Sequence, residues 1–580
     1  MLPRAVRTVV AGLSVMVAGW LALSIAAAHP HSARDFLQAR REAEAKAAAF
    51  AEPAPTEVAL ADAPDPSEAS ASGNAATPGC RLTIRLTDAA TGKQLPGLIR
   101  VTNLATGKAV ELRGPIKRDM NWYAIAAPAA VPVPQSRLKV EALRGLETEL
   151  TEREIDVTGK AEATIELPLK RFYDAAARRL VAGNTHLHLL NLTYEQAYRY
   201  LQIVPPADAL DLVYVSYLRR IPGDNTYITN EMVAGSISGG GDLARLSQHG
   251  VLFGNGEEHR HNFGPGGEGY GHVMFLDLLR LIHPVSIGPG IMQTGTDAPP
   301  LQQGILAARQ DGATIIWCHN RFGFEDVPNW MAGLLDAQNI FDGGAHGSYH
   351  ETFYRYLNLG MQVPFSTGTD WYIYDFSRVY VPLEEPLTSK AWLAQLRKGR
   401  TFITNGPLLE FSVEGHAAGD VIELSKRDDP SQPLEVTAKA YGRCHFAGLE
   451  LIHNGKVVHT VPCRRHEGHY RAELKHRLPV NEPGWVAVRI PLEAGTNEFD
   501  KPLFAHTSVV YLHQNGQPRF EPEIARQLLA EMQANIESIT RRGTFANDAE
   551  RERVLDVHRR GIATLEARLR QYEKPQPKQP

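Results

Sequence analysis

The sequence predicts a multi-domain protein in which a central α/β domain is flanked by two small antiparallel β-sandwich domains and followed by a C-terminal helical segment. Three observations lead to this prediction. The chain has 580 residues, and at about 150 residues per domain that length suits three or four domains. Hydrophobicity alternates with a period of two in residues 80–175 and 408–515. Strand-like and helix-like runs alternate in residues 176–407, and helical spacing dominates residues 516–580.

Composition places the chain among ordinary globular proteins and narrows the range of partners. Hydrophobic residues make up 43% and charged residues 22% of the chain, close to the globular average. The formal net charge is -4, so the basic surplus of nucleic-acid-binding proteins is missing and no nucleic-acid partner is expected. Four cysteines are too few for a disulfide scaffold. Ten of the 22 histidines fall between His186 and His350, which indicates a metal site there.

The N-terminal residues 1–28 have the pattern of a targeting segment. Arg4 and Arg7 precede an apolar run that ends in the small residues Ala26-Ala27-Ala28. This pattern is typical of a secretory signal peptide, although a run of about twenty residues is also long enough for an uncleaved membrane anchor. The protein is therefore expected to be secreted or periplasmic, with membrane attachment only if the segment stays uncleaved. Residues 29–79, rich in Ala, Pro, Glu and Ser, are predicted to be a disordered linker.

The two flanking β domains are predicted from strand periodicity. The alternation Leu82-Ile84-Leu86, with turn signals every eight to twelve residues, is typical of a small antiparallel sandwich over residues 80–175. The alternation Leu434-Val436-Ala438 predicts a second sandwich over residues 408–515. Cys444 and Cys463 both fall in the second sandwich, where they would form a disulfide in an oxidising compartment or remain two buried free thiols.

The C-terminal segment predicts two amphipathic helices. Apolar residues recur at helical spacing in the first of them, at Ile524, Leu528, Met532, Ile536 and Ile539. A break follows, with Asn547 or Asp548 as the N-cap of the second helix. We expect both helices to pack on the body of the protein.

The central residues 176–407 alternate between short strands and helices. Leu212–Val215, Val251–Phe253 and Thr314–Trp317 have the pattern of strands, and Leu243–His249 and Leu301–Gln310 that of helices. Alternating β and α units predict a parallel sheet or barrel. Polar residues stand at the ends of the strands, where barrel enzymes place their chemistry.

Two histidine-containing motifs open this part of the chain. His186 and His188 are two residues apart on an extended segment, so both side chains point the same way and can hold one ion. The run Glu257-Glu258-His259-Arg260-His261 then packs carboxylates, imidazoles and a guanidinium together. A buried cluster of that kind needs counter-charges, which a divalent cation supplies. The alternative is a solvated loop.

Three further polar residues follow at the ends of apolar runs. His272 comes after a glycine-rich loop and begins a strand, His319 ends the strand that contains Cys318, and Asp370 lies in Ser366-Thr367-Gly368-Thr369-Asp370-Trp371. Because neighbouring side chains on a strand face opposite sides, Cys318 is expected to face the core, away from His319.

The order of these motifs resembles the polymerase-and-histidinol-phosphatase (PHP) superfamily. The stretches 317–320, 366–371 and 399–407 are similar more closely to the CehA/McbA metallohydrolases, a group that includes carbaryl hydrolases. The resemblance covers residues 178–407. It implies that the central domain is a distorted TIM-like (PHP) barrel with a polynuclear metal centre at the C-terminal ends of its strands.

The resemblance also implies a set of metal ligands. They are His186, His188, Glu258, His272, His319 and Asp370, with Glu257, His259 and His261 as less certain ligands. Two positions depart from the family pattern: Val215-Ser216-Tyr217-Leu218 stands in place of Thr-Asp-His, and Asp370-Trp371-Tyr372 in place of Asp-x-His. One or two divalent transition-metal ions (Zn, Mn or Fe) are therefore expected in place of three.

The expected activity is hydrolysis by a metal-activated water, with a small-molecule ester, carbamate or phosphoester as the substrate. Asp370 would orient or deprotonate the water, and Arg260, or a protonated His261 or His259, would stabilise the developing oxyanion. The alternative is a degenerate, non-catalytic surface binding protein with a structural metal. The sequence leaves the substrate, the number of ions and the oligomeric state open.

Overall fold

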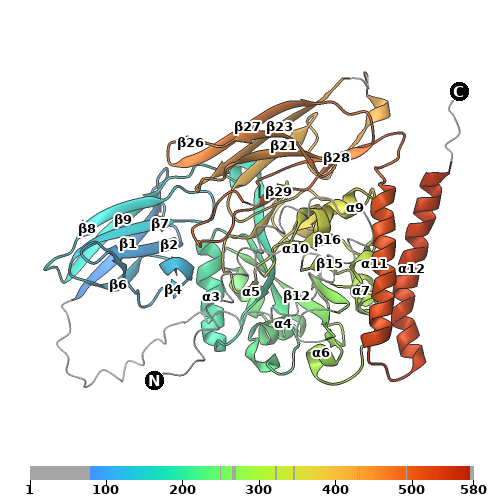
Figure 1. The fold of residues 1–580 in the computed structure, drawn as a ribbon. Helices are drawn as coiled ribbons and strands as arrows, with labels where there is room; N and C mark the ends of the chain where they lie inside the picture. Colours follow the sequence, from blue (N-terminus) through green and yellow to red (C-terminus); the bar gives the residue numbers. More distant parts are fainter. Residues whose placement is uncertain are drawn as a thin grey trace, which may run out of the picture.

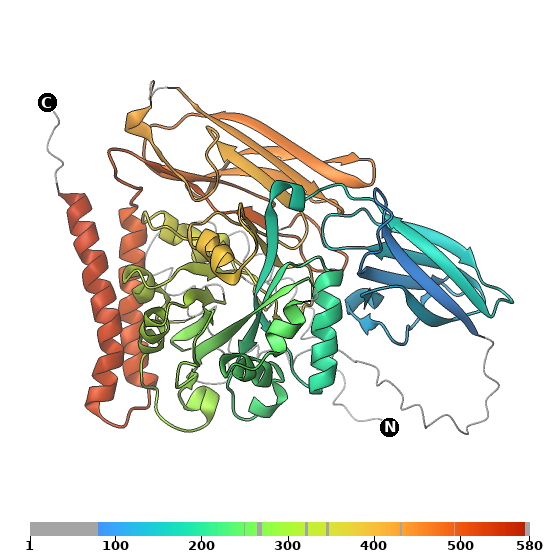
Figure 2. The same cartoon turned by 180° about the vertical axis from the view of Figure 1, so that it is seen from behind.

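In the computed structural model (Figures 1 and 2), two β-rich regions and a helical hairpin surround a central part that contains a curled sheet. The structure describes residues 79–574 apart from 249, 264–268, 320–322, 344–346, 428, 430, 431 and 492. Of the predicted targeting segment and linker, only Gly79, which begins the first strand, lies within the described residues. None of the described helices is long and apolar enough to cross a membrane.

The first β-rich domain consists of two sheets packed face to face. One sheet has the order β6 (Ala129–Pro134), β1 (Gly79–Asp88), β9 (Glu162–Leu169). The other has the order β4 (Ile116–Lys117), β5 (Tyr123–Ile125), β2 (Gly97–Asn103), β7 (Arg137–Leu143), β8 (Thr151–Asp156), with β3 (Lys108–Ala109) beside β2. Leu82, Val101 and Val140 are buried between the two sheets. The predicted antiparallel pattern needs one correction: β1 and β9 run parallel, because β9 enters from the facing sheet and not through a hairpin with β1.

The central part is a large curled mixed sheet, shaped like half a barrel, with helices between its strands. Its strands are β10 (Leu180–His188), β11 (Leu212–Tyr217), β12 (Leu252–His261), β13 (Gly271–Leu276), β14 (Ser286–Ile287), β15 (Thr314–Cys318), β16 (Ala337–Asn339), β17 (Phe365–Ser366), β18 (Asp370–Trp371), β19 (Arg378–Pro382) and β20 (Phe402–Thr404). Its helices are α3 (Tyr194–Ala207), α4 (Thr229–Ile237), α5 (Asp242–Ser247), α6 (Pro289–Met292), α7 (Leu301–Gln310), α8 (Asp326–Met331), α9 (Arg355–Leu357) and α10 (Ser389–Arg397). The predicted alternation of strands and helices is confirmed. The last predicted residue of the helix 243–249, His249, lies outside the described residues.

The direction of each strand determines which edge of the sheet its ends reach. β10, β11 and β12 are parallel neighbours, as are β15, β16 and β17. Between these groups β13 runs antiparallel to both β12 and β15. The segment 365–371 then connects the two ends of the curl, because β17 pairs with β16 and β18 pairs with β10.

The second β-rich region, predicted to begin at residue 408, shares a sheet with the central part. One of its sheets, in the order β21 (Leu408–Val413), β23 (Leu434–Gly442), β27 (His469–Leu478), β26 (Arg464–His466), is separate. Its other strands are β22 (Val421–Glu423), β24 (Gly448–His453), β25 (Lys456–Pro462), β28 (Gly484–Arg489), β29 (Ala505–Thr507) and β30 (Val510–His513). These continue the central sheet, because β29 pairs with β20. Cys444 and Cys463 are free thiols, and Cys444 Sγ donates a hydrogen bond to Glu498.

The two predicted C-terminal helices are confirmed and pack on the body. They are α11 (Pro522–Arg542) and α12 (Asp548–Glu573), which lie side by side along one flank of the central part (Figure 1). Asn547 is the N-cap of α12, its side chain accepting a hydrogen bond from the amide of Glu550 at 3.0 Å. Buried Arg355 joins the helices to the body through ion pairs with Asp326 of α8 and Glu531 of α11. Removal of one member of such a buried group would leave a buried charge unpaired.

A buried histidine marks the junction between the central sheet and the second β-rich region. His506 on β29 accepts a hydrogen bond from the hydroxyl of Tyr354 at 2.7 Å and donates one to the carbonyl of Thr507 at 2.7 Å. Burial, with the positive charge of Arg489 and the ring of His350 nearby, lowers the pKa of His506 to about 3. The folded protein therefore holds this ring neutral.

We expect this histidine to make the protein less stable in mild acid. Below the unfolded pKa of about 6.5, the unfolded chain binds a proton that the folded protein does not, so stability is complete above that pH and falls by about 1.4 kcal/mol per pH unit below it. His506→Gln should therefore reduce the loss of unfolding free energy between pH 7 and pH 5.5 by about 1 kcal/mol. Urea unfolding at both pH values measures the difference, and the same loss in both proteins would contradict the prediction.

Candidate metal centre

Parallel strands bring the first candidate ligands to one edge of the curled sheet. His186 and His188 lie at the C-terminal end of β10, Glu258 lies near the C-terminal end of β12, and His319 directly follows β15. Because the C-terminal ends of parallel strands meet at one edge, side chains far apart in the sequence come together there. His186, His188 and Glu258 are fully or almost fully buried.

The other two candidate ligands reach the same edge by different routes. His272 lies at the beginning of β13, which is antiparallel to its neighbours, so the first residues of β13 stand beside the last residues of β12 and β15. Asp370 arrives on β18, beside β10. Its backbone has a φ of 58°, a strained conformation for a residue that is not glycine. A side chain at Gly343 would lie 2.7 Å from Oδ2 of Asp370, so this position needs glycine.

The carboxylate of Glu258 lies at the centre of the cluster. Its Oε2 is 3.1 Å from Nε2 of His188 and 3.8 Å from Nε2 of His186. Its Oε1 is 3.0 Å from Nδ1 of His272 and 3.5 Å from Nε2 of His319. The two oxygens of one carboxylate therefore face two different pairs of histidines.

The carboxylate of Asp370 repeats this division. Its Oδ1 is 3.4 Å from Nε2 of His186 and 3.8 Å from Nε2 of His188. Its Oδ2 is 3.8 Å from Nε2 of His319. The donor atoms thus form two neighbouring groups, one of His186, His188, Glu258 and Asp370 and one of Glu258, His272 and His319. Within each group they lie within 4.8 Å of one another, close enough to hold a metal ion. Both groups contain Glu258, and Asp370 reaches the second only at His319.

Two of the histidines are oriented by neutral acceptors outside the cluster. His188 donates its Nδ1–H to the backbone carbonyl of Ser216 at 3.1 Å, and His272 donates its Nε2–H to the side-chain carbonyl of Asn262 at 2.8 Å. In each ring the other nitrogen then carries a lone pair toward the carboxylates. Hydrogen bonds of this kind are the usual support of metal-binding histidines.

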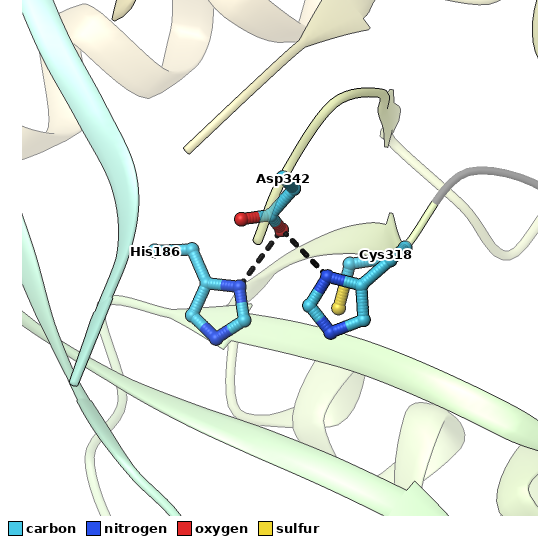
Figure 3. A group of neighbouring side chains, drawn as sticks. His186, Cys318 and Asp342 are labelled. Atoms are coloured by element: carbon cyan, nitrogen blue, oxygen red, sulfur yellow. Dashed lines mark hydrogen bonds and ion pairs between the residues drawn. The ribbon is translucent and has the colours of Figure 1, made fainter. Parts of the chain in front are cut away.

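Asp342, which was not predicted from the sequence, belongs to the same cluster (Figure 3). It is 4% exposed and lies three residues beyond β16. Its Oδ2 lies 2.8 Å from Nδ1 of His186 and 3.4 Å from Nδ1 of His319, and it accepts a hydrogen bond from the side chain of Asn339 at 2.8 Å. An aspartate followed by two glycines, just after an apolar pair, was the available signal. β16 is only three residues long, too short for periodicity to reveal.

Several donor atoms of the cluster are buried without a hydrogen bond. Among the described residues, Glu258 Oε1, His272 Nδ1, His319 Nδ1, Asp342 Oδ1 and Asp370 Oδ1 have none. Buried polar atoms without a partner are rare in folded proteins, and an ion or a water is one explanation for them. Carboxylate oxygens and imidazole nitrogens are donors suited to Zn, Mn or Fe. The residues therefore fit a metal ion.

The charges of the cluster also favour a cation. The cluster holds three buried carboxylates, Glu258, Asp342 and Asp370, and the guanidinium of Arg260 approaches the first, with NH1 3.5 Å from Glu258 Oε2. Burial, reinforced by the two other carboxylates, raises the pKa of Asp370 to about 7. Burial alone would raise the pKa of Glu258 as well, but Arg260 and the neighbouring histidines lower it well below its usual range. A bound cation would relieve the repulsion between these carboxylates.

Alternation along β12 separates Glu257 and His259 from the cluster. Since successive side chains on a strand face opposite sides, Glu258 and Arg260 face the cluster and their neighbours do not. Glu257 instead accepts a hydrogen bond from His259 at 3.1 Å, and the ring of His259 stacks on Phe275. The expectation that Glu257 or His259 adds a ligand, or that His259 stabilises an oxyanion, is not met.

His261 is also directed away from the cluster. Its ring stacks on Tyr270 with 3.7 Å between the centroids, its Nε2 donates to Asp297 at 2.8 Å and its Nδ1 accepts from the Tyr270 amide at 3.0 Å. Both nitrogens are therefore occupied by protein groups. The catalytic and ligand roles expected of His261 are not supported by its position.

Cys318 lies closer to the cluster than expected. Its buried, free thiol lies within 4.8 Å of donor atoms of His186, His319 and Asp342 (Figure 3). The prediction that it faces the core away from His319 relied on strand alternation, but β15 ends at Cys318 and His319 lies beyond it.

Tyr372 occupies the position at which the family pattern has a histidine, and it does not enter the cluster. Its ring packs against Tyr200 and its hydroxyl donates to the carbonyl of Leu190. The half-buried Trp371 instead lies beside the centre, with its ring 5.4 Å from the ring of His188 and 5.7 Å from that of Tyr227. It forms an aromatic wall next to the ligands.

No family model matches the sequence, and neither does any curated protein or any solved structure.

The close approach of Gly368 to His186 gives a test of the arrangement. A Cβ at Gly368 would lie 2.6 Å from Cβ and 2.9 Å from the backbone nitrogen of His186. We expect Gly368→Ala to displace His186, with a loss of about 1–3 kcal/mol of stability and a Zn²⁺ affinity roughly tenfold weaker or more. Thermal unfolding and chelator competition measure the two effects.

The matched control is Gly235→Ala, because a Cβ at Gly235 meets no atom within 4 Å. This variant should keep the Zn²⁺ affinity of the unmodified protein. Equal affinities for Gly368→Ala and Gly235→Ala would show that the position of His186 does not depend on this contact.

Proposed function

We propose that the protein is a metal-dependent hydrolase that holds two divalent transition-metal ions, zinc, manganese or iron, and acts on an ester, carbamate or phosphoester bond of a small molecule. The observation that carries the proposal is the division of Glu258 and Asp370, each of which directs its two oxygens toward different histidines. Carboxylates shared in this way are what two adjacent ions need, because each ion requires negative ligands.

The donor groups assign residues to each ion. The first ion would be held by Nε2 of His186 and His188, with one oxygen from each carboxylate. The second would be held by Nδ1 of His272, Nε2 of His319 and the other oxygen of Glu258. Oδ2 of Asp370, 3.8 Å from Nε2 of His319, would be a further ligand of this ion. A structural site is usually closed by four ligands around one ion. A cluster with shared carboxylates is more in keeping with a catalytic centre.

The resemblance to the PHP superfamily, and to the CehA/McbA metallohydrolases within it, is part of this proposal. The order of the ligands along the chain and their position at the ends of parallel strands support a distorted TIM-like (PHP) barrel. The two departures from the family pattern support two ions and not three. Near one of them, Ser216 supplies only a backbone carbonyl to His188, and at the other Tyr372 packs away from the centre.

The residues around the centre suggest how catalysis proceeds. When bound, the ions would supply Lewis-acid charge and lower the pKa of a water to about 7. Asp370, which reaches both donor groups, would orient that water. Arg260 lies beside Glu258, where its charge would stabilise negative charge developing on the substrate. Trp371 would provide an apolar surface for the rest of the substrate.

The targeting pattern in residues 1–28 supports a secreted or periplasmic location. The formal net charge of -4 supports small molecules and not nucleic acid as the partners. The alternative is a non-catalytic surface binding protein that keeps a structural metal. The two departures from the family pattern favour this alternative, and the shared carboxylates oppose it.

We expect two transition-metal ions per chain, and a loss of at least one in the His186→Ala/His188→Ala double variant because that variant lacks both nitrogen ligands of the first ion. Inductively coupled plasma mass spectrometry measures the content of purified protein before and after loading with Zn²⁺ or Mn²⁺. The control is His459→Ala/His476→Ala, which removes a stacked pair of histidines in the second β-rich region. No bound metal after loading would refute the proposal.

We expect the loaded protein to hydrolyse chromogenic carboxylate esters, carbamates or phosphoesters, and to lose this activity on chelation and in the double variant. The reason is that the reacting water depends on the ions. Initial rates with each substrate class, before chelation and after restoring the metal, measure the effect. Metal binding without hydrolysis of any class would favour the non-catalytic alternative.

A further inference from the structure

Asp342 contacts two of the proposed ligands, His186 and His319, on the side of their rings that faces away from the shared carboxylates. Its Oδ2 is 2.8 Å from Nδ1 of His186 and 3.4 Å from Nδ1 of His319. The two rings are nearly parallel, with 5.3 Å between their centroids and 24° between their planes. Their opposite nitrogens, Nε2, both face Glu258 and Asp370. One carboxylate oxygen therefore contacts the outer side of both rings.

The hydrogen-bond pattern indicates which nitrogen of His186 carries the proton. An ionised carboxylate can only accept, so Nδ1 of His186 must be the donor to Asp342, which leaves Nε2 as the nitrogen that could bind an ion. An ion held by Asp342 and Nδ1 would instead need the lone pair of His186 on Nδ1. The proton would then lie on Nε2, which is 3.4 Å from Asp370 and 2.9 Å from Nε2 of His188. That would remove a metal donor from the side where both shared carboxylates converge.

Oδ2 of Asp342 is close to three nitrogen atoms, whereas its Oδ1 has no hydrogen-bond partner among the described residues. Besides the contacts with the two histidines, Oδ2 accepts a hydrogen bond from Nδ2 of Asn339 at 2.8 Å. His188 and His272 show the same arrangement with other acceptors, a backbone carbonyl and an asparagine side chain. All four histidines thus direct one nitrogen outward to a protein oxygen and the other inward.

We propose that Asp342 is a positioning residue and not a metal ligand: it holds His186 and His319 with their Nε2 atoms directed at the ions. This inference rests on the proposed function, because it assumes that the inner nitrogens bind metal. A negatively charged acceptor would also raise the basicity of the two rings more than a neutral carbonyl does. The competing arrangement is a separate site formed by His186, Cys318, His319 and Asp342, whose donor atoms are also close together.

The experiment compares Asp342→Asn with the unmodified full-length protein, both stripped by chelation and reloaded with Zn²⁺. Asparagine keeps the shape but cannot accept from both rings with a full charge. We expect the same number of ions per chain and a Zn²⁺ affinity about 10- to 100-fold weaker, measured by mass spectrometry and by competition with a chromogenic chelator. The loss of one whole ion per chain would instead make Asp342 a ligand and overturn the inference.

Cobalt substitution tests the competing site directly. If Cys318 and Asp342 held an ion, the Co²⁺-loaded protein would show a thiolate-to-metal charge-transfer band that disappears in Cys318→Ser. We expect no such band, because Cys318 is outside the two donor groups that share Glu258. Its presence would overturn the inference even if the affinity of Asp342→Asn fell as expected.

Two further variants separate positioning from general loss of structure. Asp297→Asn removes a similar carboxylate–imidazole contact, 2.8 Å from His261 and outside the cluster, and should leave the Zn²⁺ affinity unchanged. Asn339→Ser removes one donor to Asp342 and should weaken Zn²⁺ binding less than Asp342→Asn does; it also serves as the test if Asp342→Asn does not fold. Unchanged affinity in Asp342→Asn, or in Asn339→Ser where that variant is the test, would overturn this inference alone. An unmodified protein that binds no ion would overturn the proposed function with it.

Discussion

The carboxylate of Glu258, buried among four imidazoles, joins the strands that carry the candidate ligands. A carboxylate out of water is costly unless nearby groups stabilise its charge. Here each oxygen faces two ring nitrogens, and Arg260 lies beside one of them. These contacts come from strands throughout the curled sheet, so the geometry of the sheet and the charge of its centre are coupled.

The curl of the sheet brings its two ends to this carboxylate. β18 pairs with β10 while β17 pairs with β16, and the short segment between β17 and β18 carries the chain from one end of the curl to the other. Gly368 lies in that segment, in contact with His186, and Gly343 makes similar room for Asp370. Because these two glycines have no side chain, Asp370, the last ligand in the sequence, can approach His186, the first. The second β-rich region extends the same sheet through β20 and β29 and supports this closure from outside.

Much of this arrangement could be predicted because it depends on local periodicity. The strands and helices of the central part follow from apolar runs, and His186, His188, Glu258, His319 and Asp370 were identifiable because each lies where such a run ends. Asp342 escaped because β16 is too short to produce a pattern. Glu257, His259 and His261 were included too readily, since a run of polar residues does not show which of its members face one side. The continuity of β20 with β29 was equally hidden, because pairing between distant strands leaves no mark on local sequence.

The kinds of donor available, their order along the chain and the strands on which most of them lie can be read from the amino-acid sequence. These properties depend on residue identity and on the repeat of a single strand. The folded chain adds which donors share one space, which nitrogen of each histidine faces inward and which carboxylate lies on the outer side of the rings. The physical reason is that these choices depend on register, strand direction and the curl of the sheet, which arise from contacts between residues far apart in the chain.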